Sequence, residues 1–162
     1  MAQPIVEQHG LQLLVPGHLS GVMVLGDASA LKRLLWILLD NAVKYSNPNG
    51  TITLSVETLA GQTKVMVHDN GIGISPADLP FVFDRFYRAD PSRSVVEGNG
   101  LGLAIAKWIA ETHQAELSVT SDAKGGTSFN IVFDNVQTST VQGISTEIPS
   151  GQSQEHFATA LE

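Results

Sequence analysis

The sequence predicts one α+β domain in which helices cover a mixed sheet. Residues 51–69 alternate apolar and polar side chains on both sides of a Gly-Gln turn, which indicates a β-hairpin. Residues 27–45 repeat apolar side chains every three or four positions, as an amphipathic helix does. A single core is expected, because the chain has 162 residues with 43% hydrophobic content.

The remaining elements of the domain are predicted from shorter patterns. The apolar runs at 11–15 and 21–25 are bounded by glycine or proline, and each is expected to be a buried strand. Asp27 is a suitable cap for the helix that follows, and Ser-Asn-Pro-Asn-Gly ends this helix after Tyr45. A helix that begins at glycines is expected from about residue 100 to 113.

The C-terminal third contains a second hairpin and then changes in composition. Residues 115–121 and 127–133 alternate across a Gly-Gly turn. From residue 135 onward Ser, Thr, Gln, Gly and Glu dominate without a sustained apolar period. We therefore expect residues 1–134 to form the domain and 135–162 to be a flexible extension.

Composition excludes several classes of function. The net charge of -7 argues against general binding of nucleic acid or of an anionic membrane, because both favour a basic surface. The absence of cysteine excludes disulfides and thiolate metal sites. No apolar run approaches the roughly 18 residues that span a bilayer.

Three glycines at alternate positions precede the second predicted helix, in Glu-Gly-Asn-Gly-Leu-Gly-Leu. Gly98, Gly100 and Gly102, with Leu101 between the last two, leave backbone N–H groups open at the positive end of a helix, which suits an anion. A dinucleotide-binding fingerprint is disfavoured, because it needs a strand directly before the glycines, and a polar loop precedes them here.

Asn41, Lys44 and Tyr45 lie close together near the end of the first long helix. An amide oxygen suits magnesium, a lysine suits phosphate, and an aromatic ring can pack against a base. Two other interpretations remain open: Asn41 as a core amide bonded to backbone, and Lys44 with Tyr45 as a solvated edge.

The segment His-Asp-Asn-Gly-Ile-Gly-Ile begins where the predicted hairpin ends. Asp69, followed by Asn-Gly, is compatible with an ordinary turn. However, the second glycine allows close approach of a flat ligand between Gly71 and Gly73. The Asp69 carboxylate can then accept a hydrogen bond from the exocyclic amine of adenine.

The segment Phe-Val-Phe-Asp-Arg-Phe-Tyr-Arg is rich in aromatic residues. Phe81, Phe83, Phe86 and Tyr87 are expected to form a small satellite core that fixes a loop. Arg88 is not needed for packing and opens the polar loop that leads to the glycines, where it can reach a phosphate. A solvated arginine is the alternative.

Taken together, these segments resemble, in order, the nucleotide-binding boxes of sensor histidine kinases. The segments are LLDNAVKYS (N box), DNGIGI (G1 box), FVFDRFYR (F box), GNGLGLAIAKWI (G2 box) and GGTSF (final glycine and threonine box). The resemblance implies the Bergerat fold, a two-layer α/β sandwich with a mixed sheet, helices on one face and a mobile ATP lid.

The resemblance also implies a role for each candidate residue. Asn41 would coordinate magnesium, Lys44 and Arg88 would contact the ATP phosphates, and Asp69 would bind the adenine amine. Thr127 would support Asp69, directly or through water. The other residues implied at the ATP site are Tyr45, Gly71, Gly73, Gly98, Gly100, Leu101 and Gly102, and the lid would run from about Arg88 to Gly98.

Two departures from the family pattern refine this expectation. Ile37 stands where the family often has an asparagine and where hydrolytic relatives have a glutamate, and an isoleucine cannot act as a base. None of the five histidines lies in the sequence context of a phosphoacceptor. We therefore expect a monomeric, cytoplasmic catalytic domain whose parent kinase is membrane-anchored.

Such a domain would bind Mg-ATP or ADP and donate the γ-phosphoryl group to a histidine on a separate dimerisation domain, with a response regulator downstream. Two alternatives remain: a nucleotide-sensing regulatory module and an anti-sigma-type serine kinase. Lys44 favours a kinase over a sensor, and the long F box argues against the serine kinase.

Overall fold

The computed structural model describes residues 2–17, 23–59, 61–89, 99–122, 125–134 and 154–156. Its main sheet has five strands in the order β1-β3-β4-β6-β5. These are β1 (Gln12–Leu14), β3 (Thr51–Leu59), β4 (Gln62–Asp69), β6 (Gly126–Asp134) and β5 (Ala115–Asp122). β1 runs parallel to β3, and the other neighbouring strands are antiparallel. The predicted mixed sheet and both predicted hairpins are confirmed.

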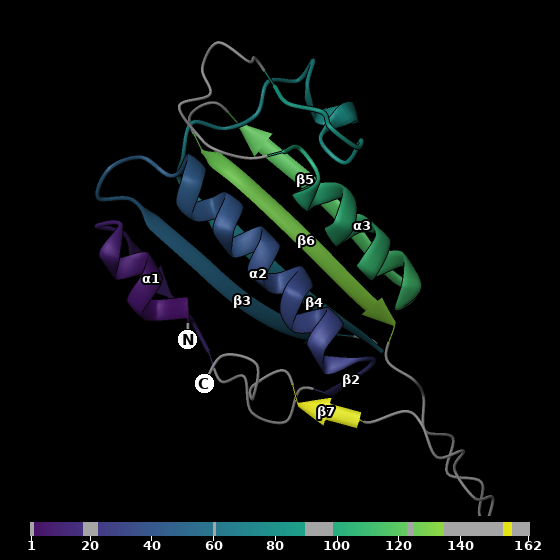
Figure 1. Ribbon diagram of the computed structural model, residues 1–162. Coiled ribbons are helices and arrows are strands. Elements are labelled where there is room, and N and C mark those ends of the chain that lie inside the picture. The colour runs from purple at the N-terminus through teal and green to yellow at the C-terminus, as the bar shows by residue number, and fades with distance from the viewer. Residues whose placement is uncertain are drawn as a thin grey trace, which may run out of the picture.

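Three α-helices lie on one face of this sheet, as Figure 1 shows. They are α1 (Ala2–Gln8), α2 (Ala28–Tyr45) and α3 (Gly102–Thr112). α2 and α3 lie side by side (Figure 1), with α2 against β3 and β4 and α3 against the edge strand β5. The predicted two-layer arrangement is therefore confirmed. Among the described residues, no helix has both the length and the apolar character needed to cross a bilayer.

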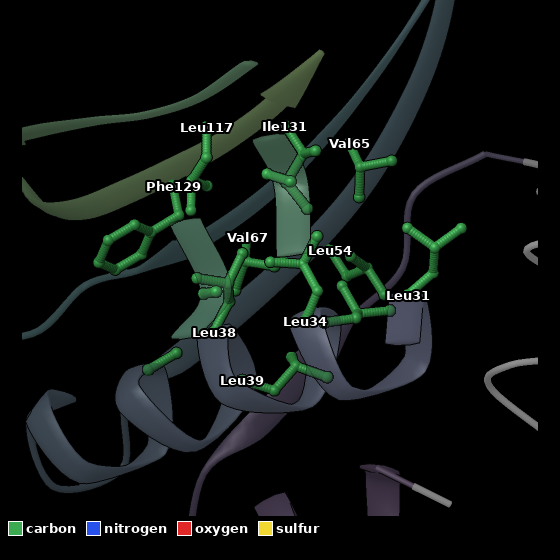
Figure 2. Packing of buried hydrophobic residues seen from close by; sticks show 14 of the residues in the cluster. Leu31, Leu34, Leu38, Leu39, Leu54, Val65, Val67, Leu117, Phe129 and Ile131 are labelled. Carbon is green, nitrogen blue, oxygen red and sulfur yellow. The ribbon is translucent and has the colours of Figure 1, made fainter. Parts of the chain in front are cut away.

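The core lies between α2 and the sheet. Asp27 caps the helix by accepting a hydrogen bond from the Ala30 N–H at 2.7 Å, as predicted. The buried face of α2 consists of Leu31, Leu34, Leu35, Leu38, Leu39 and Ala42. Figure 2 shows leucines of this face against Val65, Val67 and Ile131 of the sheet. Truncation of the fully buried Leu34 to alanine would cost about 2–5 kcal/mol.

The His113 side chain links the N-terminus of α2 to the C-terminus of α3 through two hydrogen bonds. Its Nδ1 lies 2.8 Å from the Ile109 carbonyl oxygen, and the Asp27 N–H donates to its Nε2 at 3.1 Å. Because a carbonyl oxygen only accepts, Nδ1 is the protonated nitrogen and Nε2 is the acceptor. Gly26 leaves room for this ring, since a Cβ there would lie 2.6 Å from the His113 Cδ2.

The two short N-terminal strands are present but are not the buried strands that the sequence predicted. β1 is at the edge of the main sheet, and Leu14 is 51% exposed. β2 (Met23–Leu25) lies outside that sheet and buries only Val24. The prediction of burial was wrong because each strand contacts the core with one face only.

α1 and β7 were not predicted from the sequence. α1 precedes the first strand and buries Val6 against the core. Within the expected flexible extension, β7 (Gln154–His156) pairs antiparallel with β2. The rest of the extension, 135–153 and 157–162, lies outside the described residues.

Candidate functional site

Asp69 is the last residue of β4 and is 2% exposed. Its Oδ1 accepts a hydrogen bond from the Gly71 N–H at 2.9 Å. Burial raises the pKa of this carboxyl, and the Gly71 amide, His68 and the Thr127 backbone only partly offset that effect. The end of β4 thus presents a carboxylate whose backbone partners favour its ionised, accepting form.

The glycine segment after Asp69 passes directly against the end of α2. A Cβ on Gly71 would lie 2.0 Å from the Tyr45 carbonyl oxygen, so only glycine fits there. The Ile72 N–H donates to that same oxygen at 3.1 Å. Gly73 has φ +71°, a conformation that favours glycine. The Tyr45 residue is 41% exposed. The structure therefore brings Asp69, Gly71 and Tyr45 together.

Asn41 is half-buried on α2, one turn before Tyr45. Its Nδ2 donates to the Ile37 carbonyl oxygen at 2.7 Å. This bond uses the amide nitrogen within the helix and leaves Oδ1 as an acceptor for another group. An amide oxygen is a suitable ligand for magnesium. Among the described residues no group of three or more His, Asp or Glu could hold a metal ion, so a cation would rely on Asn41 and on ligand oxygens.

Lys44 forms an ion pair with Asp40 one turn earlier, with Nζ to Oδ2 at 2.6 Å. The two side chains are 36% and 42% exposed. Exposed pairs of this kind contribute only about 0–1 kcal/mol, so a phosphate can compete with Asp40 for the ammonium group.

A backbone hydrogen bond between Phe86 and Gly100 joins the aromatic-rich segment 81–88, called the aromatic box below, to the residue pair that precedes α3. The Phe86 N–H donates to the Gly100 carbonyl oxygen at 2.8 Å. Gly100 has φ +65°, and a Cβ there would lie 2.8 Å from the Tyr87 carbonyl oxygen. The geometry requires glycine at this position. Arg88 is exposed just beyond this closure.

The predicted lid can be placed only in part. Its residues 90–98, which include the candidate Gly98, lie outside the described residues. α3 begins directly after the closure, with Leu101 as its N-cap residue and Gly102 as its first residue.

Gly102 brings the start of α3 against the middle of α2. A Cβ on Gly102 would lie 3.4 Å from the Ile37 Cγ2, so the two helices pack closely here. Ile37 is one turn before Asn41, so the N-terminus of α3 lies one helical turn away from the Asn41 position. Unpaired N–H groups and the helix dipole favour an anion at this end of α3.

Thr127 lies directly opposite Asp69 in the pairing of β4 with β6. It is buried, and its Oγ1 lies 3.2 Å from the Oγ of Ser121 on β5. Ser121 is not among the site residues expected from the sequence. The alternation in β5 would have revealed it, because Ser121 falls on the same face as the buried Leu117, where an apolar residue is expected.

The aromatic box forms only part of the predicted satellite core. Phe83 packs edge-on against Phe129, with ring centroids 6.4 Å apart. In contrast, Phe81 at the end of η1 (Leu79–Phe81) is 47% exposed, and Phe86 is 71% exposed. The prediction is therefore wrong for Phe86, whereas Phe81 remains half-exposed and contacts Tyr87. Phe86 cannot turn inward, because its backbone has φ +66° and is bonded to Gly100.

Tyr87 does belong to the packed part of this box. Its hydroxyl donates to the Asp78 Oδ1 at 2.6 Å, and this bond is the main cause of the raised pKa of Tyr87. The Phe81 and Tyr87 rings lie 5.6 Å apart. The box is thus attached to the domain through Phe83 and Tyr87.

Comparisons with known proteins agree with this arrangement. The family model for "Histidine kinase-, DNA gyrase B-, and HSP90-like ATPase" matches residues 26–137. The sensor histidine kinase YkoH of Bacillus subtilis is 43% identical over 122 residues, which are 75% of this chain and 26% of YkoH. The sensor histidine kinase CusS of Escherichia coli K12 is 41% identical over 124 residues, 76% of this chain and 25% of CusS. The chain thus spans about a quarter of the length of these relatives.

Solved structures show the same fold. The mycobacterial sensor histidine kinase MprB has a TM-score of 0.66 at 30% identity, covering 80% of this chain and 86% of that one. The catalytic domain of the histidine kinase ThkA has a TM-score of 0.68 at 20% identity, covering 82% and 84%. Full-length ShkA in complex with AMPPNP has a TM-score of 0.68 at 24% identity, covering 80% of this chain and 27% of ShkA. At these identities the last two comparisons concern the fold alone.

Proposed function

The chain belongs to the family of histidine kinase-, DNA gyrase B- and HSP90-like ATPases, and on that premise we propose that it transfers the γ-phosphoryl group of ATP to a histidine on a separate dimerisation domain. It is the ATP-binding catalytic domain in this scheme. A response regulator would take the phosphoryl group downstream, and the domain would work in the cytoplasm of a membrane-anchored parent.

Adenine recognition is assigned to the end of β4. The Asp69 carboxylate is buried and accepts a hydrogen bond from the Gly71 N–H, and its remaining lone pairs can accept a further hydrogen bond from the exocyclic amine. Gly71 and Gly73 would line the flat face of the base, with Tyr45 at its edge. This buried carboxylate, bonded to the first glycine of the segment Gly71–Gly73, is the observation that supports the proposal most directly.

Phosphate binding is assigned to α2 and to the start of α3. The N–H groups around Gly100, Leu101 and Gly102 would face the polyphosphate, and Lys44 would exchange Asp40 for a phosphate oxygen. Arg88 would reach the γ-phosphate. The Asn41 Oδ1 would hold magnesium, which supplies charge neutralisation at the phosphate oxygens when bound.

In the transfer step, the bond between the γ-phosphorus and the bridging oxygen of ADP breaks, and the oxygen keeps the electron pair. A new bond forms between that phosphorus and a ring nitrogen of the acceptor histidine. The chain contributes positioning and charge stabilisation, which dominate catalysis in this type of reaction. Ile37 packs against Gly102 and offers no base to activate water, so transfer is favoured over hydrolysis.

The decisive experiment combines the purified domain with a dimerisation domain from a sensor histidine kinase and radiolabelled ATP. We expect weak but acid-labile phosphorylation of the added domain, and little ATP hydrolysis by the catalytic domain alone. Acid-stable product would favour a serine kinase. Nucleotide binding without any transfer would favour a nucleotide-sensing module.

A further inference from the structure

Ser121 lies at the end of a row of polar residues that crosses three strands. The register pairs Ser121 of β5 with Thr127 of β6, and Thr127 with Asp69 of β4. Directly opposed residues in antiparallel strands lie on the same face of a sheet. The row therefore lies on the face that otherwise holds the apolar core, and Ser121 belongs to the same surface as the adenine-binding carboxylate.

The Ser121 hydroxyl joins the two chain segments that flank Asp69. It accepts a hydrogen bond from the Ile74 N–H at 2.8 Å, in the glycine segment that follows Asp69. It also donates to the Gly126 carbonyl oxygen at 2.8 Å, directly before Thr127. Gly126 itself is tightly enclosed, since a Cβ there would lie 1.8 Å from the Asp69 carbonyl oxygen.

The hydroxyl has one proton, which decides the direction of the remaining bond. A carbonyl oxygen can only accept, so the Ser121 proton goes to Gly126. In the 3.2 Å contact between the two hydroxyls, Thr127 is therefore the donor and Ser121 the acceptor. Thr127 then keeps only acceptor lone pairs for any other group. Its oxygen and the Asp69 carboxylate both accept.

We propose that Ser121 is a positioning residue that fixes Thr127 as an acceptor and so makes the base site selective for a 6-amino purine over a 6-oxo purine. The inference rests on the proposed function. A 6-amino group donates to both acceptors, whereas a 6-oxo group faces only lone pairs and is repelled. Without the Ser121 hydroxyl, the Thr127 hydroxyl can rotate its proton toward a ligand, and the Ile74 N–H loses its hydrogen-bond acceptor.

The test is a comparison of ADP with inosine diphosphate, which carries a 6-oxo group. Dissociation constants are measured by calorimetry for the wild-type chain, Ser121→Ala, Ser121→Thr and Ser118→Ala. Ser118 is a matched control, because it lies on the same strand but on the opposite face. All variants are first checked for native circular dichroism.

We expect Ser121→Ala to weaken ADP binding about tenfold, as loss of a partly buried hydrogen-bond network does. The affinity for inosine diphosphate should fall less than the affinity for ADP. The preference for ADP should therefore decrease by about threefold or more. Ser121→Thr keeps the hydroxyl and should restore the preference, and Ser118→Ala should equal the wild-type chain. If Ser121→Ala does not fold, Ser121→Cys gives the same comparison, because a thiol is only a weak donor.

Other results would overturn the inference. An unchanged preference in Ser121→Ala, including equal losses for both nucleotides, would mean that the hydroxyl does not set the polarity of Thr127. A loss of preference in Ser118→Ala as large as in Ser121→Ala would point to general damage of β5. Failure of the wild-type chain to bind either nucleotide would instead overturn the proposed function itself.

Discussion

The backbone nitrogen of Asp27 lies 3.1 Å from Nε2 of His113, so the cap of α2 is bonded to the residue that ends α3. His113→Ala would remove this link between the helices, and we expect the free energy of unfolding to fall by about 1 kcal/mol, as for a typical hydrogen bond. Urea denaturation measures this loss. His9→Ala is the control, because the exposed His9 ring contacts the Ile5 carbonyl oxygen of its own helical segment and not another element that the structure describes. Equal losses in both variants would argue against a specific role for the link.

Nucleotide affinity should depend on the Asp69 carboxylate. Asp69→Asn preserves the shape but replaces an acceptor oxygen with a donor, so ADP affinity should fall at least tenfold, about 1.4 kcal/mol or more. Calorimetry measures the change. Asp134→Asn, at the exposed end of β6, should bind ADP as the wild-type chain does. Unchanged binding in Asp69→Asn would remove the assignment of the base site.

The same carboxylate should make stability depend on pH. Because burial raises the pKa of Asp69, the folded chain holds this proton more tightly than the unfolded chain does. The Asp69 contribution to the free energy of unfolding should therefore be lost as the pH rises from the ordinary aspartate value of about 3.9 through the raised folded value. Relative to the wild-type chain, Asp69→Asn should gain stability across this window. A pH series of urea titrations that shows a constant difference would contradict the prediction.

Magnesium should bind through Asn41. Asn41→Ala removes an amide oxygen whose orientation is fixed by the hydrogen bond from Nδ2 to the Ile37 carbonyl oxygen. The variant should therefore weaken the binding of Mg-ATP more than the binding of metal-free ADP. The measurement is the ratio of the two dissociation constants with magnesium or with a chelator present. A matched control is Asn130→Ala on β6, outside the site. Equal losses for both ligands would make Asn41 an ordinary packing amide.

Gly71 should tolerate no side chain. Gly71→Ala would place a methyl group 2.0 Å from the Tyr45 carbonyl oxygen, which forces the glycine segment away from α2. We expect a loss of unfolding free energy of about 1–3 kcal/mol, the cost typical of overpacking, together with weaker ADP binding. Gly125→Ala is the control, because its nearest neighbour would be 3.6 Å away. Thermal melts and calorimetry on the two variants test the contrast.

Much of the fold could be predicted because its signals are local. The Asp27 cap and the strict alternation of residues 51–69 depend only on neighbours in sequence, and both match α2, β3 and β4. α1 was missed because it buries Val6 against the distant α2 while the rest of its short sequence is polar or ambiguous. The pairing of β2 with β7 joins Met23 to His156, and no local pattern predicts such a partner.

The candidate site could be predicted where a residue type is chemically unusual for its position. Asp69 beside two glycines is such a case. The alternation of β5 marks the position of Ser121, but its role could not be predicted, because that role depends on the Ile74 N–H and the Gly126 carbonyl oxygen, which come from other segments. The exposure of Phe86 was also unpredictable, since it follows from a backbone angle rather than from composition.

The hydrogen bond between Phe86 and Gly100 also has a consequence for the length of the stretch 87–99 between them. The hydrogen bond from the Phe86 N–H to the Gly100 carbonyl oxygen sets the distance between the two ends of the stretch 87–99, whatever residues lie between them. Closing a longer loop costs little additional entropy, only about 0.6 kcal/mol for each doubling of length. We therefore expect a change in the length of this stretch to leave α3 in its place on the sheet. An insertion between Gly71 and Ile74 has no such freedom, because that stretch is bonded to α2 and to β5.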